Sequence, residues 1–171
     1  MTRVGKLLVA GLAIGLLGGC AAYTLGPTNG LEAGSRTVRI EPFTNQTLQP
    51  RIGDDVTTAL RRRIQEDGTY RLSTHGDPDV IVSGVLTLYS RQGLSFVPQD
   101  VLTVRDFSVS LKAEVTVRDA GNGKVLWQRA VTGHTMVRVG SDLTSAERQA
   151  RPLLADDLAR KVIELLVDGS W

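Results

Sequence analysis

Cysteine and histidine are scarce in this sequence. Among its 171 residues Cys20 is the only cysteine, and His75 and His134 are the only histidines. A lone thiol excludes an internal disulfide and a cysteine cluster for a metal, so stability must come from packing. The two histidines are 59 residues apart, and no serine lies in a G-x-S-x-G turn. We therefore expect no enzyme activity and no metal site.

A hydrophobic run long enough to cross a membrane is missing from the N-terminal region. The apolar stretch Leu7–Leu17 has eleven residues, whereas a transmembrane helix needs about 20. Arg3 and Lys6 precede this stretch, and two glycines and Cys20 follow it. A short positive segment followed by a short apolar segment is typical of a secretory signal peptide. The sequence therefore predicts a signal peptide at residues 1–19.

The small residues before Cys20 resemble the lipobox of bacterial lipoproteins. There the thiol takes a diacylglyceryl group, the peptide is cut before the cysteine, and the new amino terminus is acylated. Two or more acyl chains give stable membrane anchoring, whereas one does not. We expect a covalent lipid on Cys20 and no other cofactor. The alternative is an ordinary signal peptide whose cysteine is incidental.

The predicted mature chain has no surplus charge. Arg3 and Lys6 are two of the 20 basic residues, so 18 basic and 18 acidic residues remain after residue 19. A nucleic-acid-binding protein needs a basic surplus on one face. The balance therefore argues against a nucleic-acid partner.

Three regions follow from composition. Residues 1–19 form the signal peptide, and residues 20–36 are rich in Gly, Pro, Thr and Asn, which predicts a tether from the lipid to the fold. Residues 37–171 suit a single domain. In enteric lipoproteins an aspartate directly after the lipidated cysteine signals retention in the inner membrane. By that analogy Ala21 predicts an outer-membrane location on the periplasmic side.

The first part of the domain alternates between strand and helix patterns. Thr37–Phe43 alternates as a strand, and Pro50–Asp67 repeats an apolar residue every four positions, as a helix does. We interpret Thr44–Thr47 as a loop and Tyr70–Leu72 as a short extended piece. The three arginines Arg61–Arg63 fit a solvated helix end, with a phosphate-binding patch as the alternative.

The second part has the clearest strand pattern. Val80–Tyr89 is nearly all apolar and predicts a central strand, and 92–100 predicts a loop or a bulged strand end. Within the expected strand 101–118, odd-numbered side chains from Phe107 to Val117 are apolar and even-numbered ones from Asp106 to Arg118 are polar. One face of this strand should therefore be buried and the other solvated.

A hairpin and a final helix complete the domain. Asn122-Gly123 predicts positive φ angles in a turn over 119–124, and 125–139 returns as the partner strand. Thr144 and Glu147 match a capping box at the start of the last helix. Pro152 predicts a kink or a fresh start within it.

These elements predict an α+β fold. The order is strand, helix, strand, strand, strand, helix. We expect a two-layer sandwich in which two helices cover one face of about four mostly antiparallel strands.

Several segments, in order, resemble the LptE (RlpB) family of outer-membrane lipoproteins. Together they cover about residues 37–167. The first two are VRIEPFTNQT from Val38, with Pro50 after it, and DGTYRL from Asp67. The others are DVIVSG from Asp79 and AEVTVRD from Ala113, which runs into GKVLW at Gly123. The resemblance implies a non-enzymatic protein that sits inside the LptD β-barrel, helps it fold, plugs it and contacts lipopolysaccharide.

Contacts to the phosphates of lipopolysaccharide should be cationic. The candidate lipopolysaccharide-binding residues are basic and lie on the two long predicted strands: Arg105, Lys112, Arg118, Arg129 and Arg138. The alternative for each is an ordinary solvated or cross-strand paired charge, and Glu114 is placed to pair with Lys112.

Two other function classes remain open from the residues alone. One is a pilotin-like or curli-type lipoprotein accessory of a secretion channel, which would have the same shape and anchor. The other is a lipid-anchored hydrolase, against which the missing catalytic motifs argue.

Overall fold

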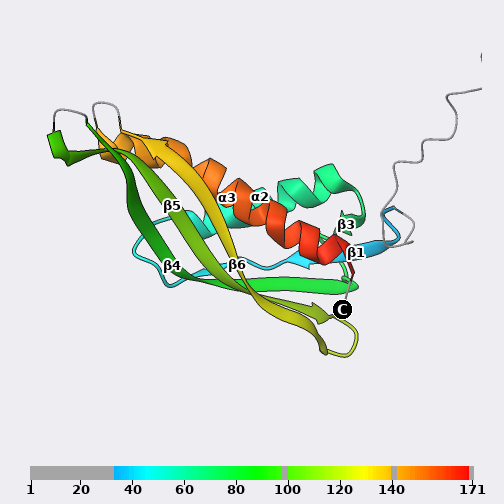
Figure 1. The fold of residues 1–171 in the computed structure, drawn as a ribbon. Helices are drawn as coiled ribbons and strands as arrows, with labels where there is room; N and C mark the ends of the chain where they lie inside the picture. The colour runs from blue at the N-terminus through cyan, green and yellow to red at the C-terminus, as the bar shows by residue number, and fades with distance from the viewer. Residues whose placement is uncertain (1–32, 98–99, 140–141, 170–171) are drawn as a thin grey trace, which may run out of the picture.

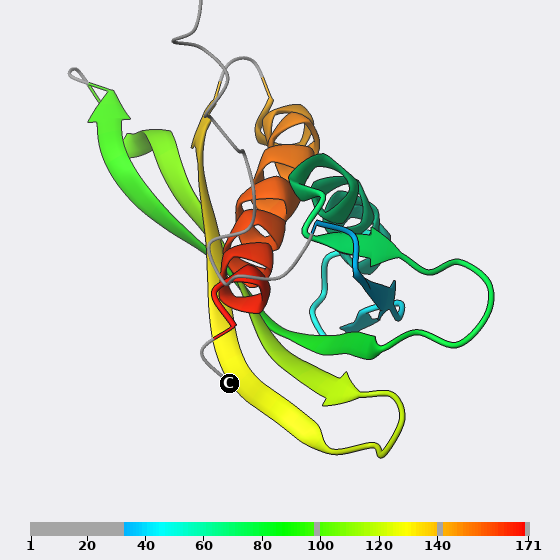
Figure 2. The ribbon, with the colours of Figure 1, turned by 90° about the vertical axis from the view of Figure 1, so that its right-hand side faces the viewer.

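Six strands form one mixed sheet in the computed structural model, which describes residues 33–169 except 98–99 and 140–141. The strands β3, β1, β4, β5 and β6 lie side by side in that order, and β2 pairs separately with β4. Their bounds are β1 Arg36–Ile40, β2 Thr44–Asn45, β3 Tyr70–Leu72, β4 Val80–Val97, β5 Asp100–Asp119 and β6 Val125–Arg138. The helices α2 (Ile52–Asp67) and α3 (Leu143–Val167) both lie on one face (Figures 1 and 2).

The expected α+β class and the two helices on one face are confirmed, but the expected four-stranded, mostly antiparallel sheet is wrong. β1 pairs in parallel with both β3 and β4, and β2 pairs in parallel with β4. The crossover through α2 returns the chain in the direction of β1, which gives parallel pairing. β3 coincides with the extended piece predicted at Tyr70–Leu72. β2 lies in the segment predicted as a loop, because two residues are too few to show a period.

β4 and β5 are longer than the alternation pattern predicts. β4 runs on to Val97, and its pairing with β5 shifts register after Gly93, so the bulged strand end is the correct alternative for 92–100. The turn after β5 differs from the prediction. Gly123 has a positive φ of 70°, but Asn122 does not. Asp119 holds the turn instead, since its Oδ1 accepts hydrogen bonds from Gly121 N and Asn122 N.

α2 buries the predicted apolar stripe: Ile52, Val56, Leu60 and Ile64. It begins at Ile52, two residues later than expected, because Arg51 has a left-handed φ of 62° that a helix cannot contain. Gly68 ends it with a φ of 74°, as predicted. Thr57 ties α2 to the chain after β1, because its hydroxyl donates to Gly53 O and accepts from Phe43 N.

α3 is one helix from Leu143 to Val167, so it does not start afresh at Pro152. The predicted capping box is wrong. Asp142 caps the helix by accepting from Thr144 N and Ser145 N. Glu147 instead forms an ion pair with Arg91 of β4 at 2.9 Å. Among the described residues no helix is long and apolar enough to cross a membrane.

α3 also covers part of the sheet edge formed by β6. Asp157 Oδ2 accepts a hydrogen bond from His134 N, and Lys161 Nζ donates one to Thr132 O, both at 2.8 Å. A Cβ at Gly133 would lie 2.8 Å from Leu158 Cβ, so only glycine allows this close approach. α3 thus occupies backbone groups that an edge strand leaves free for another strand.

We expect Asp157 to make stability depend on acid pH. Partial burial alone would raise the pKa of Asp157, but hydrogen bonds from Lys161, Arg160 and His134 N lower it from 3.8 to about 2. A lowered folded-state pKa contributes stability above the unfolded-state value and loses it as the pH falls through the folded-state value. The difference in unfolding free energy between the wild type and Asp157→Asn should therefore have its maximum value above about pH 4 and decrease as the pH falls toward about 2. Urea unfolding across that range measures it, and a difference that stays constant with pH would contradict the assignment.

Candidate functional site

The face of β4, β5 and β6 opposite the helices is polar and carries no described helix (Figure 2). We call it the outer face. On β5 the odd-numbered side chains from Val109 to Val117 are buried, as predicted. The even-numbered side chains of the outer face on β5 are small or charged: Ser108, Ser110, Lys112, Glu114, Thr116 and Arg118. Ser90 and Ser110 share a hydrogen bond of 2.7 Å across this face.

Three of the five predicted lipopolysaccharide-binding residues, Lys112, Arg118 and Arg138, lie on the outer face, spaced along its length. Each is already paired with a carboxylate. Lys112 Nζ lies 3.8 Å from Glu114 Oε1, and Arg118 lies 3.5 Å from Glu41. Arg138 lies 2.9 Å from Asp106. Hydrogen bonds from Ser95 and Arg138 lower the pKa of Asp106, so this carboxylate stays charged at neutral pH.

The other two predicted cations are not part of this group. Arg129 has the same parity as Trp127 and Val131, which puts it on the helix side of β6, where it is nonetheless exposed. Arg105 lies where the β4–β5 register shifts, and its carbonyl accepts from Val139 N. Neither arginine forms an ion pair with another residue of the described ranges. Cys20, the predicted lipidation site, lies outside the described residues.

Exposed apolar side chains accompany the charges on the outer face. Leu88 on β4 pairs with Lys112, and Met136 on β6 pairs with Ser108. Leu88 is 55% exposed and Met136 is 78% exposed. A surface that combines cations with apolar side chains suits a ligand that has both anionic and hydrocarbon parts.

The arginine triplet at the end of α2 is structural rather than a free helix end. Arg62 and Arg63 both bind Asp156 of α3, and hydrogen bonding from Arg63 lowers the pKa of Asp156. Arg61 donates to Ile40 O. The interpretation as a solvated helix end holds for Arg62, which is exposed, but not for the half-buried Arg63. Both arginines bind a carboxylate of the second helix that sequence spacing could not reveal.

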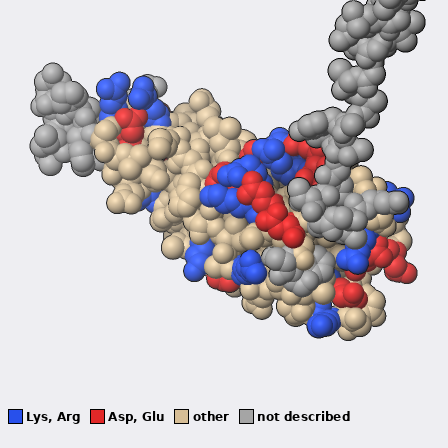
Figure 3. Space-filling model, turned by 45° about the vertical axis from the view of Figure 1, so that its right-hand side comes forward, with Lys and Arg blue, Asp and Glu red and all other residues tan. Residues whose placement is uncertain are grey.

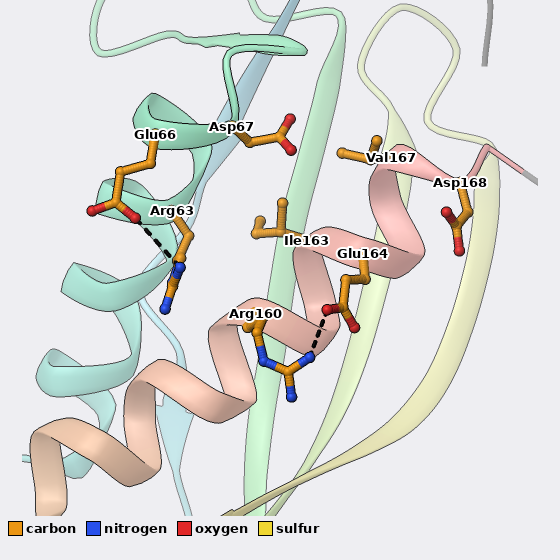
Figure 4. Close-up of a pocket in the computed structure, with 8 residues that line it drawn as sticks. All are labelled: Arg63, Glu66, Asp67, Arg160, Ile163, Glu164, Val167 and Asp168. Carbon is orange, nitrogen blue, oxygen red and sulfur yellow. Dashed lines mark hydrogen bonds and ion pairs between the residues drawn. The ribbon is translucent and has the colours of Figure 1, made fainter. Parts of the chain in front are cut away.

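A cleft of about 360 Å³ lies beside these residues, between the C-terminal halves of α2 and α3 (Figure 4). Arg63 pairs with Glu66 of its own helix as well as with Asp156, and Arg160 pairs with Glu164. Carboxylates outnumber arginines along its walls. This cleft therefore does not suit an anion.

Charges of both signs are interleaved on the helix side of the molecule, without a region of one sign (Figure 3). The two histidines lie on different elements and are exposed. His75 Nδ1 lies 3.1 Å from Thr74 Oγ1, and His134 lies on β6. In the described part of the chain no group of three His, Cys, Asp or Glu side chains could hold a metal.

Solved structures share this fold at low sequence identity. A protein from Xanthomonas campestris is 10% identical with a TM-score of 0.62, over 84% of this chain and 90% of that one. A hypothetical protein from Chlamydia trachomatis is 11% identical with a TM-score of 0.56, over 77% and 95%. A minor lipoprotein from Acinetobacter baumannii is 18% identical with a TM-score of 0.52, over 78% and 93%. At these identities the likeness concerns the fold alone.

Sequence comparison identifies the family. No curated protein matches the chain. One family model, described as LptE, lipopolysaccharide-assembly, matches residues 35–168, which span every strand and helix of the described structure. The resemblance in the sequence segments is thus confirmed, and the chain belongs to the LptE family of lipopolysaccharide assembly.

Proposed function

We propose that this chain is a non-enzymatic outer-membrane lipoprotein, anchored on the periplasmic side through lipid on Cys20. It assembles with and plugs an LptD-type β-barrel and helps deliver lipopolysaccharide to the cell surface. Membership of the LptE family supports the assembly role. The outer face is the main structural support for the proposal, because no described helix covers it and it can lie against another surface.

The ion pairs of the outer face suit a reversible phosphate contact. Lys112 and Arg118 are both exposed, and their carboxylate partners lie at 3.8 and 3.5 Å. Exposed ion pairs of this kind contribute about 0–1 kcal/mol each. A phosphate carries more charge and more acceptor oxygens than a carboxylate, so it can replace Glu114 or Glu41 as the partner. Leu88, next to Lys112, offers a contact for an acyl chain.

We expect the double variant Lys112→Asp plus Arg118→Asp to bind lipopolysaccharide at least about tenfold more weakly, because two cationic contacts become repulsive. The measurement is the dissociation constant of the purified chain for lipopolysaccharide. The matched control is Lys124→Asp plus Arg148→Asp, which makes the same change in net charge at two exposed residues, one in the turn after β5 and one on α3. Urea unfolding of both variants checks that the fold is kept.

The comparison of the two variants decides which surface binds. Loss confined to the Lys112 and Arg118 variant supports the outer face. An equal loss of affinity in both variants would show that net charge, rather than the outer face, determines binding. Unchanged binding in the outer-face variant would contradict the proposed contact.

A further inference from the structure

One side of β4 is covered by other strands for only part of its length. On the side away from β5, β1 pairs with Val80–Val82 and β2 pairs with Val85–Leu86. No strand of the described chain pairs with this side after Leu86. Figure 1 shows β4 running on past the loop that follows β2, toward the hairpin with β5. The open edge therefore lies at Leu88–Gly93, which keeps a regular register with β5 between two irregularities.

The register shows which backbone groups this edge offers. Gln46 N donates to Leu86 O, so the backbone of Leu86 faces away from β5. The register shift between Leu86 and Leu88 then reverses the parity, because Leu86 faces Ala113 while Leu88 faces Lys112. In an antiparallel pair, hydrogen-bonded and open residues alternate. The N–H and C=O groups of Tyr89, Arg91 and Gly93 therefore face outward.

A groove runs along this edge. It has a volume of about 350 Å³ and lies between the loop after β2 and β4, with a lining of Gln46, Thr47, Leu48, Gln49, Thr87, Leu88, Tyr89 and Arg91. Leu48 is fully exposed beside the half-exposed Leu88. The charge of Arg91 is already matched by its ion pair with Glu147. The groove thus offers backbone pairing and apolar contact without a net charge.

The opposite edge of the sheet differs. On β6, Asp157 and Lys161 occupy the outward backbone groups of His134 and Thr132. Proteins commonly block edge strands in this way to prevent pairing with other chains. No described side chain makes such a contact to the backbone of Tyr89, Arg91 or Gly93. The contrast distinguishes a protected edge from one left available.

We propose that Leu88–Gly93 of β4 is a strand-addition site, which an extended, uncharged segment of the partner barrel protein joins as a further strand. The segment pairs with the backbone of Tyr89, Arg91 and Gly93 and places an apolar side chain between Leu48 and Leu88. The inference rests on the proposed function for the identity of the partner.

A second copy of this chain fits the edge less well. In antiparallel pairing of two copies, outward residues must face outward residues, here Tyr89, Arg91 or Gly93. Every register that places Arg91 opposite Tyr89, Arg91 or Gly93 sets the two Arg91 side chains directly opposite or diagonal to one another. Only the pairing of Tyr89 with Tyr89, or of Gly93 with Gly93, keeps them further apart. Like charges in those positions destabilise a strand pair. A neutral segment of another protein avoids this repulsion.

Residue-resolved amide hydrogen exchange tests the proposal on the full-length lipoprotein, free and in its complex with the co-purified barrel. In the free chain, Leu88, Ser90 and Gln92 should exchange slowly and Tyr89, Arg91 and Gly93 quickly. In the complex, we expect exchange at the latter three to slow by at least about tenfold, because each N–H gains an acceptor. Unchanged exchange there, in a complex that does form, would overturn the strand-addition site and leave the proposed function standing.

A pair of variants at one position separates backbone pairing from side-chain contact. Arg91→Pro removes the outward N–H, which proline can lack at a strand edge, whereas Arg91→Ala removes the side chain and keeps the N–H. We expect Arg91→Pro to reduce recovery of the barrel at least about tenfold relative to Arg91→Ala. Equal recovery would argue against the site. If the wild-type chain recovers no barrel, the proposed function is contradicted, and so is the barrel as the partner of this edge.

Discussion

Replacing Leu158 by alanine is expected to lower the unfolding free energy by about 2–5 kcal/mol, because the smaller side chain leaves a cavity in the core. Leu158 is 0% exposed at the centre of α3. It lies against Gly133, where a Cβ would be 2.9 Å from its backbone nitrogen. The helix and strand are therefore already in contact and cannot close further over a lost side chain. Urea unfolding of the purified lipoprotein measures the change.

Leu153 provides the matched control on the same helix. It is 62% exposed, so Leu153→Ala removes the same atoms from a site mostly in water. We expect it to change the unfolding free energy by no more than about 0.5 kcal/mol. Similar losses for the two variants would show that α3 does not pack on β6 through Leu158.

Gly84 on β4 is expected to tolerate no larger residue. A Cβ there would lie 2.3 Å from Cε1 of Phe43 and within 2.8 Å of two further ring atoms. Phe43 is buried, so its ring cannot move into solvent. We expect Gly84→Ala to lower the unfolding free energy by about 1–3 kcal/mol, the usual range for overpacking a core.

A double-mutant cycle attributes that loss to the ring. In a Phe43→Leu background the clashing ring atoms are absent, so Gly84→Ala should be less destabilising by more than about 0.5 kcal/mol. The same loss in both backgrounds would assign the effect of Gly84 to its backbone rather than to Phe43.

Long periodic segments could be predicted from sequence because each has enough residues to show its period. The alternation through β5 placed Val109 to Val117 in the core, and the four-residue repeat of α2 placed Ile52 to Ile64 there. β2 and β3 are shorter than one informative period, and their parallel pairing depends on a crossover that no local pattern encodes.

Local signals also failed where a nearby residue competed. Asp142 caps α3 in place of Thr144, because its carboxylate, two residues earlier, accepts from the free N–H groups of Thr144 and Ser145. Arg51 adopts a left-handed conformation that delays α2, and composition gives no sign of it.

The sequence predicted which face of β5 carries the candidate cations, but not all of the carboxylates with which they pair. Alternation placed Lys112 and Arg118 on the solvated side of β5, as the structure has them. Of their two carboxylate partners only Glu114, which is close to Lys112 in sequence, could be foreseen, whereas Glu41 lies just after β1, far from Arg118 in sequence. The open edge of β4 carries no sequence signal, because it follows from where β2 ends.

The central claim is that this LptE-family lipoprotein assembles with a β-barrel, and co-purification tests it most directly. The tagged chain is expressed in its native outer membrane, solubilised in mild detergent and recovered, and the co-purified proteins are identified and quantified. We predict the lipopolysaccharide-assembly barrel in an amount equal to that of the lipoprotein. Recovery of a secretin or another export channel, as a pilotin-like or curli-type accessory would give, or of no barrel, would contradict the account.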